Sequence, residues 1–171
     1  MKVRLASPIT YDSIVDGPGL RMVIWTQGCI HNCEGCHNPQ THDLNAGFWL
    51  DHEQIIEQIK KTKLQKGITL SGGDPFLQAK ALIPITAEAK KLGLDVWAYT
   101  GFRWEFLMHP NNPSHIEHYE LLTYVDTLVD GRFMKEKKSV DLIFRGSSNQ
   151  RIIDVQKSLQ EKEIICRAEY M

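Results

Sequence analysis

The sequence has no long hydrophobic run. Nowhere does it approach the roughly 18 consecutive apolar residues that a membrane-spanning helix requires. The first ten residues contain two basic side chains, Lys2 and Arg4, but no apolar stretch of the kind that follows them in a secretion signal. These two absences argue against membrane insertion and secretion, and we expect a cytoplasmic protein.

The sequence also has no excess of charge of either sign. Its 20 basic and 21 acidic residues leave a net charge of −1, and 42% of the chain is hydrophobic. A nucleic-acid-binding surface and intrinsic disorder are therefore both disfavoured. The 171 residues are enough to bury a substantial core, and we expect one domain spanning residues 1–171.

Cysteine is scarce, but its placement is uneven. Three of the four cysteines, Cys29, Cys33 and Cys36, fall within eight residues, and Cys166 stands alone near the end. A disulfide framework does not suit so few cysteines in a reducing cytosol. Gly28 and Gly35 disfavour both helix and strand here, so we expect a loop that turns three thiols toward one point.

Three clustered thiols suit an iron–sulfur cluster, which usually takes four cysteine ligands. With three ligands, a [4Fe-4S] cluster would keep one iron open for chemistry, as a catalytic zinc keeps one position open. The alternative is a closed zinc site completed by His31, His37 or Cys166. Zinc ligands usually come in two separated pairs, whereas this chain has one triplet and one distant cysteine, which favours the cluster.

Six sequence blocks occur in order along the chain. They are residues 13–19 (SIVDGPG), the cysteine loop with His37, Asn38 and Pro39, residues 71–75 (SGGDP), 99–101 (YTG), 130–133 (DGRF) and 145–151 (RGSSNQR). The set resembles the radical S-adenosylmethionine superfamily, and more narrowly its glycyl-radical-enzyme activases that serve anaerobic ribonucleoside-triphosphate reductases. One departure is Gly35, where many members of the superfamily have an aromatic residue before the third cysteine.

The resemblance implies two cofactors, a [4Fe-4S] cluster and S-adenosylmethionine. Cys29, Cys33 and Cys36 would be the cluster ligands. Around the third cysteine, the expected S-adenosylmethionine contacts are Gly35, Cys36 and His37. Further contacts are expected from the turn at Gly72, Gly73 and Asp74, and from Asp130 and Arg132, which match an Asp-x-Lys element of a related activase. The superfamily has glutamate where Asp74 stands, so the resemblance carries over to Gly73 more firmly than to Asp74. No residue is expected to act as a general acid or base.

Hydrophobic periodicity predicts strands that alternate with helices. The expected strands are residues 20–26, 68–70, 94–100, 127–129, 151–155 and 163–167. The expected helices are one capped by Asp51, one with Pro84 in its first turn, one carrying Ile116, Tyr119 and Leu122, and a short one between the last two strands. Repeated βα units predict an α/β fold with a mostly parallel sheet. A closed eightfold barrel needs at least about 200 residues, so we expect an open, partial βα barrel of the radical S-adenosylmethionine type, with the motifs at the carboxyl ends of its strands.

The resemblance also implies the activity and the partners. The cluster would cleave S-adenosylmethionine reductively to a 5′-deoxyadenosyl radical, which takes a hydrogen atom from a glycine loop of the large anaerobic ribonucleotide reductase subunit. An electron donor such as a flavodoxin is expected, with no nucleic-acid or membrane partner. Two alternatives remain open at this point: a radical enzyme acting on a small deazapurine or pterin, and a non-enzymatic zinc or electron-transfer module.

Overall fold

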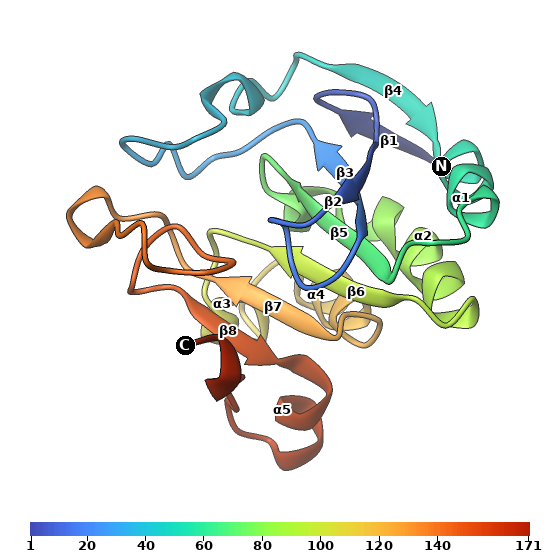
Figure 1. The fold of residues 1–171 in the computed structure, drawn as a ribbon. Helices are drawn as coiled ribbons and strands as arrows, with labels where there is room; N and C mark the ends of the chain where they lie inside the picture. The colour runs from blue at the N-terminus through green and yellow to red at the C-terminus, as the bar shows by residue number, and fades with distance from the viewer.

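The computed structural model describes all 171 residues as an α/β arrangement around one eight-stranded sheet (Figure 1). The strands are β1 (Lys2–Leu5), β2 (Thr10–Ser13), β3 (Arg21–Thr26), β4 (Phe48–Asp51), β5 (Gly67–Gly72), β6 (Asp95–Tyr99), β7 (Thr127–Asp130) and β8 (Arg151–Asp154). The helices are α1 (His52–Lys61), α2 (Ala79–Lys91), α3 (Trp104–Leu107), α4 (His115–Leu122) and α5 (Val155–Glu161).

The centre of the sheet is parallel, as the sequence predicts. Strands β3, β5, β6 and β7 pair in that order and in parallel. They are β-branched and aromatic runs that are buried for most of their length, which is typical of strands covered on both faces. The sheet does not close, since its path runs from β4 at one end to β8 at the other. The open, partial barrel is therefore confirmed.

Antiparallel strands extend this parallel centre at both ends. On one side β1 pairs with β3 and β4, and β2 adds a further pairing to β3; on the other side β8 pairs with β7. Sequence analysis missed β1, β2 and β4. Each is only four residues long, which is too short for a period of two to stand out; β1 does alternate between exposed and buried side chains, whereas β2 and β4 are mostly exposed.

Helices α1, α2 and α4 pack on one side of the sheet (Figure 1). The main apolar core lies between them and the sheet, and includes Val96 and Ala98 of β6. Trp97, whose side chain points to the opposite face, packs instead with Val129 and Ile152, and Phe144 and Tyr170 cover this second cluster. The alternation along β6 therefore separates a helix-covered face from the inner face of the partial barrel.

Three sequence expectations are corrected by the structure. Pro84 lies inside α2 rather than in its first turn, because α2 already begins at Ala79. A mid-helix proline forfeits a backbone hydrogen bond, and the burial of Leu82 and Ile85 on either side of it offsets that cost. The core face of α4 is formed by His118, Leu121 and Leu122, while Ile116 and Tyr119 are exposed.

The third correction concerns residues 163–167, which form no strand. This segment makes only an isolated antiparallel bridge, between Cys166 and Ile153 of β8. The apolar run 164–166 predicts a strand, but its pairing with β8 is limited to this bridge, which is held by hydrogen bonds from Asp154 N to Ile165 O at 2.8 Å and from Arg167 N to Ile152 O at 2.7 Å.

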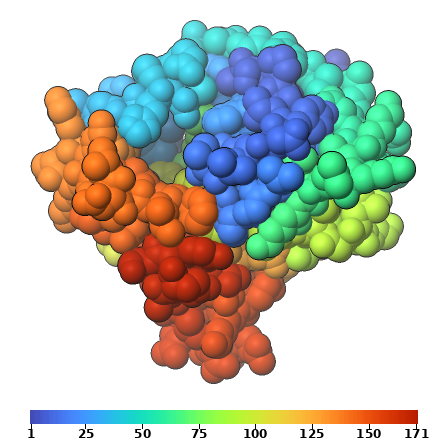
Figure 2. All heavy atoms as spheres, in the orientation of Figure 1, coloured from blue at the N-terminus to red at the C-terminus, as the bar shows by residue number.

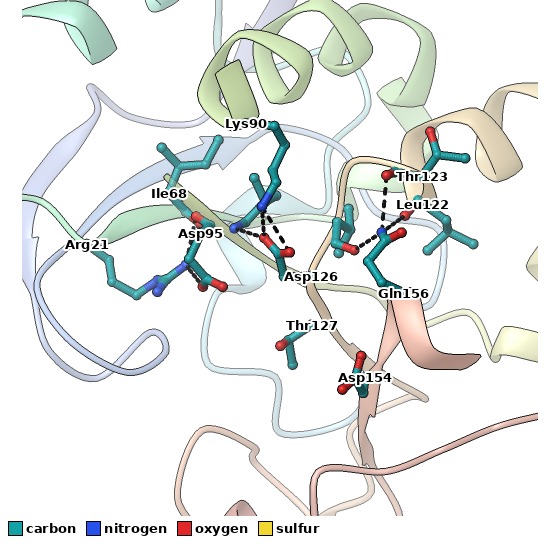
Figure 3. A network of polar contacts seen from close by, with 12 residues as sticks. Arg21, Ile68, Lys90, Asp95, Leu122, Thr123, Asp126, Thr127, Asp154 and Gln156 are labelled. Atoms are coloured by element: carbon teal, nitrogen blue, oxygen red, sulfur yellow. Dashed lines mark hydrogen bonds and ion pairs between the residues drawn. The ribbon is translucent and has the colours of Figure 1, made fainter. Parts of the chain in front are cut away.

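Charged side chains join the amino ends of the parallel strands (Figure 3). The fully buried Arg21 at the start of β3 donates to Ile68 O at 2.8 Å and to Asp95 Oδ2 at 2.7 Å. Beside this pair, Lys90 of α2 donates to Asp126 just before β7 at 2.7 Å. These contacts stabilise the amino ends of the strands, whereas sites in βα folds form at the carboxyl ends.

None of the helices has the length and apolarity needed to cross a membrane.

Candidate active site

A cavity of about 780 Å³ opens at the carboxyl ends of the parallel strands. Its size falls within the range of about 300–1,000 Å³ typical of sites for small molecules and cofactors. It is lined by Cys29, His31, Cys33, Cys36, His37, Gly72, Gly73, Tyr99, Thr100, Gly101, Gly131, Phe133, Phe144, Gly146 and Gln150, among others. All six sequence blocks contribute residues to this lining, including residues 14–16 of the first block and Arg145, Gly146 and Gln150 of the last.

The cysteine loop is held in place through its backbone. Gly28 N donates to Thr41 O at 2.7 Å and Cys29 N donates to His42 O at 3.3 Å, which ties the start of the loop to the turn that follows it. Asp74 N donates to Gly28 O at 2.8 Å, which ties the loop to the end of β5. The loop therefore has a fixed entry, although Asn32 in its middle adopts a left-handed φ of 50°.

The three thiols share this cavity as free cysteines. Burial raises the pKa of the Cys29 and Cys33 thiols. No three His, Cys, Asp or Glu side chains lie close enough together to hold a single metal ion. The sequence predicts a loop that turns the three thiols toward one point. In the structure they line a common cavity but do not meet at one point. Metal binding is coupled to folding, and bonds to iron would supply both the deprotonation and the final approach of the sulfur atoms.

The Gly72-Gly73 turn is shaped by the cysteine loop next to it. A Cβ on Gly73 would lie 2.2 Å from Gly28 O, and one on Gly72 would lie 2.4 Å from Thr26 O. Gly72 also has a φ of 102°, which side chains rarely adopt. Both glycines are therefore required by the chain's own backbone. They bring the end of β5 against the start of the loop while their exposed edge lines the cavity.

Asp74 is buried and surrounded by donors. Its carboxylate accepts hydrogen bonds from Thr100 Oγ1 at 2.9 Å, Gly101 N at 2.9 Å and Phe76 N at 3.0 Å. His31 Nε2 lies 2.6 Å from Asp74 Oδ2, and since an ionised carboxylate only accepts, that nitrogen is the donor. Asp74 is not part of the cavity lining, so its side chain joins the cysteine loop to the ends of β5 and β6.

Sequence analysis considered His31 only as a zinc ligand, and missed its pairing with Asp74. The ring is buried, packs edge-on against Phe102, and lies so close to Gly101 that a Cβ there would be 2.3 Å from His31 Cδ2. Its Nδ1 is buried and has no hydrogen-bond partner in the chain. The signal available in the sequence was a histidine inside the cysteine triplet together with a glycine directly after Thr100.

His37 and Gly35 lie beside Phe133, which follows β7. The His37 ring is 5.5 Å from the Phe133 ring, and a Cβ on Gly35 would be 3.4 Å from Phe133 Cε1. Gly35 has a φ of 78°, a backbone conformation that favours glycine at this position. Phe133 instead supplies an aromatic ring on this side of the cavity.

Asp130 and Arg132 line a second, adjoining cavity of about 750 Å³, which shares His31, Gly101 and Gly131 with the first. Asp130 is buried and accepts from Trp104 N at 2.8 Å and from Arg151 Nε at 3.0 Å. Arg151 also binds Glu105 with two hydrogen bonds of 2.9 Å, and this lowers the pKa of Glu105 to about 2. Neither Asp130 nor Arg132 lines the first cavity, although Gly131 between them does.

Cys166 lies apart from this cavity, at the bridge to β8, where it packs against the main core. The triplet and the single cysteine therefore stand in different surroundings, as their spacing in the sequence indicated.

The comparisons with known proteins define first a class and then a family. Residues 15–153 match the family model described as "4Fe-4S single cluster domain", so the chain is an iron–sulfur protein of that class. Among curated proteins, it is 34% identical over 147 residues to an anaerobic ribonucleoside-triphosphate reductase-activating protein of Haemophilus influenzae, covering 81% of this chain and 90% of the relative. The proteins of that name from Escherichia coli K12 and Enterobacteria phage T4 are 37% and 33% identical, and cover 80% and 84% of this chain and 90% and 93% of the relatives.

The chain belongs to the family of anaerobic ribonucleoside-triphosphate reductase-activating proteins, which confirms the family resemblance seen in its motifs. A solved structure, QueE from Escherichia coli, aligns with a TM-score of 0.49 at 17% identity over 59% of this chain and 53% of QueE.

The donor set in the cavity fits an iron–sulfur cluster. Three thiols face it, while His31 is committed to Asp74 and Cys166 lies elsewhere. The cavity extends beyond the thiols to a glycine turn and to aromatic walls, so it has room for a further ligand beside a cluster.

Proposed function

We propose that this protein activates an anaerobic ribonucleoside-triphosphate reductase by generating a glycyl radical on it. The observation that carries the proposal is the shared cavity, where three thiols and the Gly72-Gly73 turn meet in a chain of the activating-protein family. The rival small-molecule and zinc-module functions have no observation of their own in the structure.

Cys29, Cys33 and Cys36 hold the [4Fe-4S] cluster in this proposal and leave one iron for S-adenosylmethionine. When bound, these two cofactors supply the electron and the 5′-deoxyadenosyl radical that removes a hydrogen atom from a glycine Cα of the partner. The protein's part is to position the cofactors and to exclude water.

The backbone of Gly72 and Gly73, which lines the cavity, would hold the methionine portion of S-adenosylmethionine. Gly35 and His37 shape the wall next to the third ligand, Cys36, with Phe133 behind them. Tyr99 closes the floor as a neutral group, because burial raises its pKa.

Asp74 has a positioning role in this proposal. Its carboxylate already accepts from His31, Thr100 and Gly101, so it positions the cysteine loop against the turn instead of binding the cofactor's ammonium group directly.

Asp130 and Arg132 divide their roles in a similar way. Asp130 is occupied by Arg151, while Arg132 faces the adjoining cavity with a charge suited to the carboxylate of S-adenosylmethionine. We therefore assign the cofactor contact to Arg132 and the support of the strand end to Asp130.

The partners follow from the activity. The substrate is a glycine loop of the large reductase subunit, and the electron comes from a low-potential donor of the flavodoxin type. A reducing compartment suits a protein whose four cysteines are all free, so we place it in the cytoplasm.

Electron paramagnetic resonance tests the function directly. The reconstituted, reduced protein is mixed with S-adenosylmethionine and the anaerobic reductase of the same organism. We expect a carbon-radical doublet that collapses when the partner's glycine carries deuterium at Cα. Absence of the doublet, together with 5′-deoxyadenosine formed in step with a modified deazapurine or pterin, would establish the small-molecule function instead.

A further inference from the structure

Exposed aliphatic side chains from two distant segments stand at the mouth of the thiol-lined cavity. Ile14 and Val15, between β2 and β3, are 68% and 72% exposed. Val140 and Ile143, between β7 and β8, are 92% and 52% exposed. Ile14, Val15 and Ile143 line the cavity, and Val140 lies three residues before Ile143 in the same loop. Figure 2 shows the hollow between the blue segment near the N-terminus and the orange segment around residue 140.

The first segment is held rigidly although its apolar tip is exposed. Ser13 Oγ donates to Asp16 Oδ2 at 2.5 Å, which closes the turn around Ile14 and Val15. Asp16 O accepts from Thr69 Oγ1 at 2.6 Å, and the buried Arg21 donates to Pro18 O at 3.0 Å. The residues that follow Ile14 and Val15 are therefore tied to the sheet by hydrogen bonds.

The second segment has its own framework of hydrogen bonds. Gln150 Oε1 accepts from Gly146 N at 2.8 Å and from Ser147 N at 3.1 Å, while Arg145 Nη1 donates to Gln150 O at 2.7 Å. Ser148 N donates to Lys137 O at 2.9 Å, which joins the two sides of the loop that carries Val140 and Ile143. The hydrogen bonds of the polar block 145–151 thus stabilise the loop that carries Val140 and Ile143.

Fixed, exposed aliphatic groups around a cavity are typical of a binding surface. Their contact with water is unfavourable unless a partner covers them, and their rigidity lowers the entropy lost on binding. Because Ile14, Val15 and Ile143 line the cavity that holds the thiols, whatever covers them must also reach into that cavity.

We propose that Ile14, Val15, Val140 and Ile143 grip the glycine-bearing segment of the reductase through apolar side chains that flank the glycine. This proposal rests on the proposed function, which makes that segment the substrate. Glycine has no side chain, so its backbone alone can enter between the pairs and approach the cavity floor, while its apolar neighbours stay at the rim.

The test compares paired variants with a matched control in the cluster-loaded protein. The variants are Ile14→Ser with Val15→Ser, and Val140→Ser with Ile143→Ser. The control is Ile116→Ser, which removes an aliphatic group that is 76% exposed on α4 and is not part of the cavity. Binding to the intact anaerobic reductase is measured by calorimetry under anaerobic conditions.

We expect each pair of substitutions to raise the Kd at least about tenfold, which corresponds to about 1.4 kcal/mol of binding free energy, because two apolar contacts with the partner are lost. The control should change the Kd less than twofold. Hydrogen exchange in the parent protein should show residues 13–17 and 139–144 protected by the reductase. Unchanged affinity in both pairs, or protection that falls elsewhere, would overturn the proposal.

A separate measurement keeps this outcome distinct from failure of the function. The parent protein, reduced without the reductase, should release 5′-deoxyadenosine slowly from S-adenosylmethionine. If it does so and the paired variants still bind the reductase normally, the proposed binding surface is wrong and the proposed function stands. If the parent protein binds the reductase through the rim but cleaves no S-adenosylmethionine, the function is wrong and the surface stands.

Discussion

His31 Nε2 lies 2.6 Å from Asp74 Oδ2, and this contact joins the middle of the cysteine loop to the end of β5. The two residues are 43 positions apart in sequence, and both side chains are almost completely buried. A buried carboxylate with four donors around it holds all of them in one geometry, and losing it leaves each one unsatisfied.

Replacing Asp74 by alanine should therefore destabilise the whole site. We expect the free energy of unfolding of the metal-free protein to fall by about 3 kcal/mol, because His31, Thr100 and Gly101 lose their acceptor together. Urea denaturation followed by circular dichroism measures the change. Asp141→Ala, in an exposed loop, is the control and should stay within about 0.5 kcal/mol of the parent protein. Equal stability of the two variants would show that Asp74 is not the anchor of the loop.

The three loop cysteines should each be essential for the cluster, and the fourth should not. We expect Cys29→Ala, Cys33→Ala and Cys36→Ala to abolish cluster assembly, because each removes one of only three protein ligands. Cys166→Ala should assemble a normal cluster, since that thiol lies on the bridge to β8. Iron and sulfide content and visible absorption after anaerobic reconstitution decide this. Loss of the cluster in all four variants would mean that no iron is open.

Gly73→Ala should impair the cluster through the protein's own backbone. Its Cβ would meet Gly28 O at 2.2 Å, so the cysteine loop must move away from β5. We expect reduced iron content, with S-adenosylmethionine binding weakened as a consequence.

Gly93→Ala is the matched control for that variant. Gly93 has a φ of 78° but nothing within 4 Å of its Cβ position, so alanine there strains the backbone without moving the loop. We expect a cost of about 1 kcal/mol in stability and a normal iron content. Full cluster loading in Gly73→Ala would show that the loop does not depend on this close approach.

The ion pair between Glu105 and Arg151 should contribute a pH-dependent share of stability. The hydrogen bonds from Arg151 lower the pKa of Glu105 from 4.5 to about 2 in the folded state. A lowered pKa means that the contribution is complete above pH 4.5 and is lost as the pH falls toward 2.

We therefore expect Glu105→Gln to be less stable than the parent protein at pH 7 and 5, and the difference to shrink below pH 4. The difference should be about 1 kcal/mol or less, because Glu105 is half exposed and solvent screens the pair. Urea denaturation across this pH range measures it, with Glu57→Gln on the exposed face of α1 as the control. A difference that is independent of pH would assign it to packing instead of charge.

Much of the central fold could be predicted because its signals are local. Strands β3, β5, β6 and β7 are short, largely apolar runs that each end at or just before a motif, so their local composition located them. The edge strands β1, β2 and β4 could not be found in this way. They are defined by their pairing to neighbours and not by their own composition.

The sequence by itself determined the cysteine triplet, the glycine turn and the order of strands that carries both to one edge of a sheet, because spacing and propensity are properties of neighbouring residues. Only the tertiary structure decided what each group does there. Position 73 has room only for glycine because the Gly28 carbonyl lies against it. The Asp74 carboxylate points to His31 and Thr100, and the Asp130 carboxylate is bound by Arg151. These contacts join residues that lie tens of positions apart, and which atoms meet across such distances is set by packing of the whole sheet and not by any local pattern.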